Sequence, residues 1–413
     1  MAIEPNIPGA DLPDSRLASI RAKAAAAKNP PNPGLPPSKP LQIFLLVALV
    51  ITGAAYAVRQ WTEMTTEETM AKHPSKLKHL VEVQSKFLAE TALGQEAETK
   101  KKYEDAVLHY RKALLAEDNA EGRLNLGNAL LKQGNPDMAF SQFKEALRLE
   151  PGRETVYVAW GQALSFEGKM DEAAQLYQDA LRHSSNFAEV HFNFARVLEQ
   201  KQQTALAVQH AAELSNQPLA VSNSAAEAQL FGSDAMKHYA AAENLGMHTS
   251  EFWCNYGTLL NSLGKFPQAE QCMAKSVTQQ PGLGEAQFQL AVAQDKQGKY
   301  ADAVGHYEAT LASLPDDPAA LNNLALIYAT ATNSEVRSSK MAVLLATRAC
   351  DATTSQNARY MDTLARAYAA DGDFFQAISW EDRAVKRAAQ LADHNLLREL
   401  QPRFNLFVQH KTE

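Results

Sequence analysis

The chain has 413 residues, of which 46% are hydrophobic and 21% are charged, and this composition excludes global disorder, a collagen-like fibre and a disulfide-rich scaffold. The formal net charge is −7, so no excess of basic residues points to nucleic-acid binding. The three cysteines, Cys254, Cys272 and Cys350, are too few and too far apart for a disulfide framework or a structural zinc site.

The first forty residues are rich in proline. Half of the chain's 18 prolines fall in residues 1–40. Because proline lacks a backbone N–H and fixes φ, this segment cannot build a packed core. We expect residues 1–40 to form a disordered, extended tail.

An apolar segment follows at residues 41–58, with the sequence LQIFLLVALVITGAAYAV. It contains no charged residue and is bounded by Lys39 and Arg59. As a helix it spans roughly 27 Å, close to the bilayer's hydrocarbon thickness of about 30 Å. We therefore predict a single transmembrane helix, followed by a stalk and a lead-in helix over residues 59–86. A cleaved signal peptide is the alternative, because the small-x-small sequence at residues 55–57 ends an apolar run.

The sequence indicates less clearly which end of this predicted helix faces the cytoplasm. Lys and Arg residues near the two ends are balanced, so the positive-inside rule does not choose a side. A short internal tail with a large external domain is the commoner arrangement for an N-terminal anchor. We expect a single-pass protein of the bacterial inner membrane, with its main domain outside the cytoplasm.

A period near 34 residues runs through the rest of the chain. The clearest unit is residues 120–153. Its apolar residues recur at helical spacing, its small residues allow two helices to approach closely, and a proline ends its second helix. Numbered from 1 to 34, the unit has Leu126 at position 7, Gly127 at position 8, Ala139 at position 20, Phe143 at position 24 and Pro151 at position 32.

The same register recurs in further units, and the pattern resembles the tetratricopeptide repeat, a helix–turn–helix motif. The resemblance implies an all-α fold, a right-handed α-solenoid of about eight to nine units over residues 87–391. Residues 222–249 are expected to be irregular, because the step between Ala207 and Ala235 is shorter than the period. An insertion is expected after Tyr328, and residues 392–413 are expected to form a C-terminal capping helix.

The resemblance also implies a binding surface. In such repeats the first helix lines a concave groove, and position 6 is expected to turn away from the second helix. A side-chain amide both donates and accepts hydrogen bonds, so a ladder of amides suits an extended peptide. Alternatively, asparagine at position 6 is simply part of the repeat consensus. The candidate groove residues are Asn125, Asn128, Asn193, Asn255, Gln289, Asn323 and Arg366.

Motifs for catalysis are lacking in the sequence. It contains no phosphate-binding loop, no dinucleotide fingerprint, no HExxH, no GxSxG and no CxxC. We therefore expect no enzymatic activity, no cofactor, no bound metal and no small-molecule substrate. The sequence predicts a membrane-anchored scaffold that binds protein or peptide partners through its groove, and the alternative is an accessory subunit of an envelope enzyme or biosynthetic complex.

Overall fold

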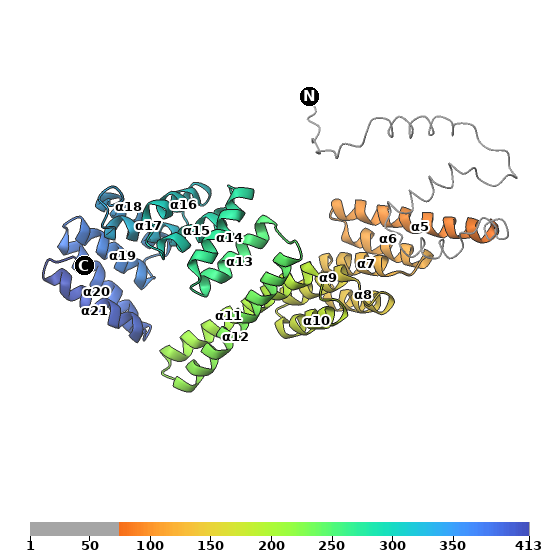
Figure 1. Cartoon of the computed structure of the whole chain (residues 1–413), viewed down its shortest axis with the longest axis horizontal. Helices are drawn as coiled ribbons and strands as arrows, with labels where there is room; N and C mark the ends of the chain where they lie inside the picture. The colour runs from red at the N-terminus through yellow and green to blue at the C-terminus, as the bar shows by residue number, and fades with distance from the viewer. Residues whose placement is uncertain (1–73, 413) are drawn as a thin grey trace, which may run out of the picture. The chain divides into compact units, whose positions relative to one another are not determined.

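The computed structural model describes residues 74–412, which form seventeen α-helices and no β-strand (Figure 1). This architecture confirms the predicted all-α, helical-repeat fold class for the described residues. The chain divides into two compact units, Met1–Asp118 and Asn119–Glu413, which are described separately. The predicted tail, the apolar segment 41–58 and residues 59–73 of the stalk lie outside the described residues. Within residues 74–412, no helix is both long enough and apolar enough to span a membrane.

The described part of the first unit is a pair of helices, α5 (Pro74–Thr99) and α6 (Tyr103–Ala116). The predicted lead-in helix and the first helix of the first repeat are continuous in α5, because no proline interrupts the helix after its first residue. The two helices pack where Gly94 meets Tyr110, and a β-carbon on Gly94 would lie 2.6 Å from Cε1 of the tyrosine. The missing side chain at position 8 thus makes room for the aromatic ring.

The second unit is a series of helical hairpins. Several first helices begin at a side-chain cap, as where Asn119 accepts a hydrogen bond from the Gly122 N–H at 2.8 Å. The helices are α7 (Ala120–Lys132), α8 (Pro136–Leu149), α9 (Glu154–Phe166), α10 (Met170–His183), α11 (Ala188–Leu214), α12 (Pro218–Asn244), α13 (Ser250–Ser262), α14 (Phe266–Gln279), α15 (Gly284–Asp295), α16 (Tyr300–Ser313), α17 (Pro318–Thr330), α18 (Ser339–Ala352), α19 (Ala358–Ala370), α20 (Phe374–Gln390) and α21 (His394–Val408).

A glycine at position 15 makes the turn between the two helices of a regular repeat. Its φ lies between 70° and 86° in five repeats, a conformation that costs an L-residue roughly 1–2 kcal/mol and glycine almost nothing. A glycine at position 15 therefore marks the turn between the two helices in these five repeats. The five residues are Gly134, Gly168, Gly264, Gly298 and Gly372.

The repeat that starts at Ala188 lacks this glycine, and its two helices are about twice as long as those of the regular repeats. Position 15 of the unit that starts at Ala188 is Gln202, and α11 continues through it to Leu214. α12 returns beside α11 over an equal length of 27 residues, and Figure 1 shows the pair side by side. We call residues 188–244 the long hairpin. The structure thus has one long hairpin where the sequence suggested a repeat and a shortened unit at 222–249.

The C-terminal end of the unit follows the sequence more closely. The predicted insertion is the loop 331–338 between α17 and α18. α21 corresponds to the predicted capping helix, and it buries Leu396, Leu400 and Phe407. Because α21 covers the apolar side of the last repeat, the array ends without an exposed core.

Candidate functional site

The predicted groove residues all lie on first helices of repeats in the second unit. Six of them are half-buried and one is buried. The structure brings some of them into contact with amides of neighbouring repeats and leaves others without such contacts. α7 carries Asn125 and Asn128, α11 carries Asn193, α13 carries Asn255, α15 carries Gln289, α17 carries Asn323 and α19 carries Arg366.

The side-chain amide of Asn193 makes hydrogen bonds within the protein. It is only 5% exposed, and its Nδ2 donates to the carbonyl oxygen of Glu189 at 2.8 Å. Its Oδ1 accepts a hydrogen bond from Nε2 of Gln162 at 3.0 Å. Gln162, at position 9 of the preceding repeat, was missed by the sequence analysis. This amide pair joins α9 to α11, so Asn193 stabilises the stacking of two repeats.

A second amide contact joins the first helices α13 and α15. Nδ2 of Asn261 donates to the backbone carbonyl of Gln289 at 2.9 Å and to its side-chain Oε1 at 3.0 Å. Nε2 of Gln289 in turn donates to a carboxylate oxygen of Glu285 at 2.9 Å. The polar atoms of Gln289 are therefore largely occupied within the protein.

Asn323 differs from the expectation for position 6. Its Nδ2 donates to the hydroxyl of Tyr307 at 3.2 Å, and Tyr307 lies on α16, the second helix of the preceding repeat. Its Oδ1 accepts from Asn322 at 3.3 Å. The side chain thus points toward a second helix, because the buried tyrosine hydroxyl needs a polar partner.

Three of the predicted amides keep their hydrogen-bonding groups available. Asn125, Asn128 and Asn255 are half-buried, and none of their three side chains has a hydrogen bond to another described residue. Two of them lie on α7 and the third lies on α13. Among the predicted amides, these three are the ones that offer both a donor and an acceptor to a bound peptide.

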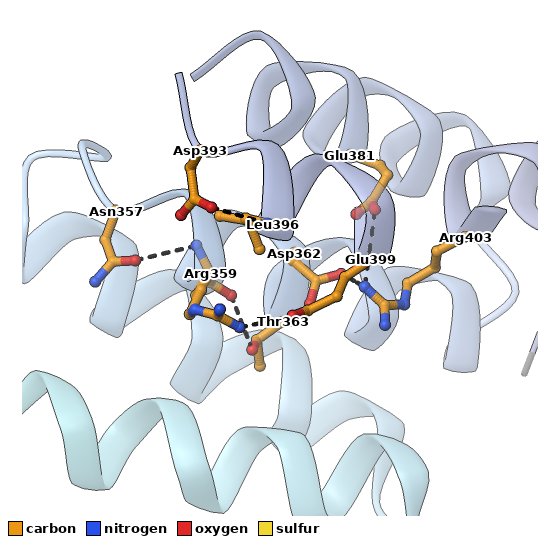
Figure 2. Close-up of polar contacts among 9 residues, drawn as sticks. All are labelled: Asn357, Arg359, Asp362, Thr363, Glu381, Asp393, Leu396, Glu399 and Arg403. Carbon is orange, nitrogen blue, oxygen red and sulfur yellow. Dashed lines mark hydrogen bonds and ion pairs between the residues drawn. The ribbon is translucent and has the colours of Figure 1, made fainter. Parts of the chain in front are cut away.

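Arg366 belongs to a charged cluster at the C-terminal end, which we call the C-terminal cluster and define as Asp362, Arg366, Glu381 and Arg403. Figure 2 shows the guanidinium of Arg403, from α21, between the two carboxyl groups. Its Nη1 lies 2.5 Å from Oδ1 of Asp362 and 4.0 Å from Oε1 of Glu381. Beside it, Arg359 of α19 contacts Glu399 of α21 at 3.1 Å. The capping helix is thus held to the last repeat by ion pairs.

Glu381 occupies position 24, where other repeats carry a large residue such as Phe143 or Tyr177. Its side chain is fully buried. Burial raises the pKa of Glu381 well above its usual range, and the Asp362 carboxylate raises it further. Burial also raises the pKa of Asp362, against the opposing effect of the arginines. Burial and the neighbouring Asp362 carboxylate thus favour the protonated form of Glu381 over its carboxylate. An acid at position 24 was the sequence signal for this cluster.

The protonation of Glu381 predicts a pH dependence of stability. A carboxyl group whose folded pKa is raised contributes stability below its ordinary pKa and loses it as pH rises toward the folded value. We expect the free energy of unfolding to fall more steeply between about pH 6 and about pH 8 in the wild type than in Glu381→Gln. Chemical denaturation at the two pH values measures this difference. The control is Glu335→Gln, at an exposed carboxylate in the loop 331–338, and a Glu381→Gln profile as steep as the wild type would contradict the assignment.

The described residues were also searched for side chains that could together bind a metal ion. No group of three or more His, Cys, Asp or Glu side chains there could hold a metal ion. The three cysteines are buried and unpaired, and burial raises the pKa of each thiol to about 11. The thiols are therefore protonated at neutral pH and are poor nucleophiles.

The repeat pattern matches the model of a known protein family. The family described as Tetratricopeptide repeat matches residues 91–154, 158–220 and 288–335. Over these three segments the chain is similar to tetratricopeptide repeats, in agreement with the glycine turns and the packing between positions 8 and 24. Comparison with curated protein sequences finds no match.

Solved structures resemble this chain at low sequence identity. PilF from Pseudomonas aeruginosa is 14% identical, with a TM-score of 0.43 over 56% of this chain and 94% of that one. YrrB, described as a TPR protein with an unusual peptide-binding site, is 15% identical, with a TM-score of 0.35 over 63% and 97%. A tetratricopeptide repeat protein from Parabacteroides merdae is 16% identical, with a TM-score of 0.40 over 68% and 98%. At these scores the likenesses say nothing about partners.

Proposed function

We propose that this chain is a membrane-anchored tetratricopeptide repeat scaffold that binds an extended segment of a protein partner along the first helices of its second unit. The observation that carries the proposal is the set of three half-buried amides, Asn125, Asn128 and Asn255, without hydrogen bonds to other described residues. Each offers a donor and an acceptor that match a peptide backbone. No catalytic step, cofactor or nucleic acid is part of this proposal.

Anchoring and location are the second part of the proposal. The uncharged residues 41–58 support a single membrane-spanning helix, with Lys39 and Arg59 at its ends. We place the protein in a bacterial inner membrane with the repeats outside the cytoplasm. The scaffold would then recruit partners at the membrane surface.

The proposed anchor predicts that the protein stays with the membrane in alkaline carbonate. A spanning helix is held by burial of its apolar side chains, which high pH does not weaken, whereas peripheral proteins are released. The measurement compares the full-length chain in the pellet and the supernatant after centrifugation. Release of the full-length chain would contradict the anchor, and a mature N-terminus near Val58 would favour the signal-peptide alternative.

Affinity capture tests the proposed role. The full chain, extracted in mild detergent, is captured together with its partners, which are identified by mass spectrometry. Several unrelated chains support a scaffold. One dominant enzyme would instead support an accessory subunit of an envelope enzyme or biosynthetic complex, and capture of no protein would contradict both.

A further inference from the structure

The first helices α13, α15 and α17 carry acidic side chains without basic ones. Within their bounds they contain no lysine or arginine, whereas Glu251, Glu285 and Asp295 are acidic. Glu251 pairs with Arg196 of α11 at 3.7 Å, and Glu285 accepts a hydrogen bond from Gln289. The side chain of Asp295 has neither an ion pair nor a hydrogen bond to another described residue.

Asp295, the last residue of α15, is half-buried. Burial raises the pKa of this carboxyl group, and the charge of Lys296 opposes the shift. Lys296 is exposed and forms no ion pair with Asp295 in the described part of the chain. A partly buried carboxylate without a partner is unfavourable, and a bound ammonium or guanidinium group would relieve it.

Two amide oxygens on the neighbouring first helices also lack a hydrogen-bond donor. They are Oδ1 of Asn261 on α13 and Oδ1 of Asn322 on α17, and both atoms are buried without a partner among the described residues. Asn322 is only 8% exposed. The Nδ2 groups of the two amides are already used, by Gln289 and by Asn323. Because buried acceptors normally find a donor, these oxygens indicate that a donor comes from outside the chain.

The hydroxyl of Tyr307 connects Asp295 to the polar groups of α17. Asn323 donates to this hydroxyl at 3.2 Å, and both burial and the nearby Asp295 carboxylate raise the pKa of Tyr307. Asp295 therefore lies close to the amides of α17. We call Asn261, Asp295 and Asn322 the acceptor row.

We propose that the segment bound along the first helices is basic and places a lysine or arginine side chain at Asp295, in the acceptor row. This inference rests on the proposed function and adds the chemistry of the partner. Lysine and arginine side chains donate hydrogen bonds and accept none, so they match a surface that offers acceptors and no basic group. Asn255 of α13 would hold the backbone of the same segment, and an acidic segment would be repelled.

Binding of three synthetic peptides to the full chain in mild detergent tests the inference. The fluorescent peptides are extended and equal in length, and every second residue is lysine, glutamine or glutamate. The lysine peptide is expected to bind most tightly and the glutamate peptide least tightly. Asp295→Asn is expected to weaken binding of the lysine peptide about tenfold or more, as for a lost hydrogen bond to a charged group, and to leave the glutamine peptide unchanged. Its melting temperature should not fall, because the substitution removes a partly buried charge.

Asp302→Asn is the matched control, since it removes an equal charge from an exposed position on α16, the second helix of the same repeat. It is expected to leave binding of the lysine peptide unchanged, and an equal loss in both variants would overturn the inference. A lysine peptide that does not bind at about 1 mM would also overturn it. Asn255→Ala separates the inference from the proposed function. If the three peptides bind equally and all are weakened by Asn255→Ala, the proposed function stands and the basic segment is wrong.

Discussion

Replacing Arg403 by leucine is expected to destabilise the second unit by about 3–5 kcal/mol, the usual cost of removing one partner from a buried ion pair. Its side chain is 14% exposed, and that of Asp362 is 13% exposed. Without the guanidinium, the aspartate carboxylate loses its contact at 2.5 Å while it stays buried. The loss also removes one of the two ion pairs between α19 and α21 that are described above. Chemical denaturation measures the change in the free energy of unfolding.

Arg398 provides a matched control on the same helix. It is exposed, and its contacts are to His394 and Asn395 of α21 itself. Arg398→Leu is expected to change stability by no more than about 0.5 kcal/mol. Equal effects of the two substitutions would show that Arg403 is not held in a buried pair.

The second large effect is expected at Gly161, position 8 of its repeat. A β-carbon there would lie 2.2 Å from Cζ of Tyr177 and 2.4 Å from its hydroxyl oxygen. The ring is fully buried, so the close-packed side chains around it leave it little room to move aside. Overpacking of this kind typically costs about 1–3 kcal/mol. We expect Gly161→Ala to lower the melting temperature clearly, measured by circular dichroism.

Gly305 is the control for this glycine. It lies within α16, and a β-carbon on it would have no atom within 4 Å. Because alanine is the better helix former, Gly305→Ala is expected to stabilise the protein by about 0.5–1 kcal/mol. If both substitutions shifted the melting temperature in the same direction, the proposed repeat register would be wrong.

Most of the repeat fold can be predicted from the sequence because its main contacts recur at fixed positions. The small residue at position 8 and the large residue at position 24 define the packing of the regular hairpins, and Gly127 with Phe143 shows the pair clearly. The long hairpin escaped prediction. Ala207 and Ala235 keep the small residues of the pattern, but Gln202 stands at the position of the turn glycine, and α11 continues through it to Leu214.

The candidate site was predictable only in part. The sequence identifies which amides lie on first helices, but a hydrogen bond depends on the residue that the neighbouring repeat places opposite. Asn193 meets Gln162, whereas Asn255 meets no such partner among the described residues. Arg366 was expected in a groove. Instead it lies near Asp362, which also pairs with Arg403 of α21. This arrangement depends on how α21 packs against α19, which the repeat pattern does not give.

The most direct test of the scaffold proposal is quantitative affinity capture with Asn128→Ala/Asn255→Ala in the full chain. Each lost hydrogen bond is expected to weaken binding by about 0.5–1.5 kcal/mol, so partner recovery should fall several-fold in the double variant. Gln271→Ala is the matched control, because this exposed amide lies on α14, the second helix of the repeat that contains Asn255. We expect Gln271→Ala to recover the same partners as the wild type in equal amounts. Unchanged recovery in the double variant, with its melting temperature intact, would contradict binding through these first-helix amides.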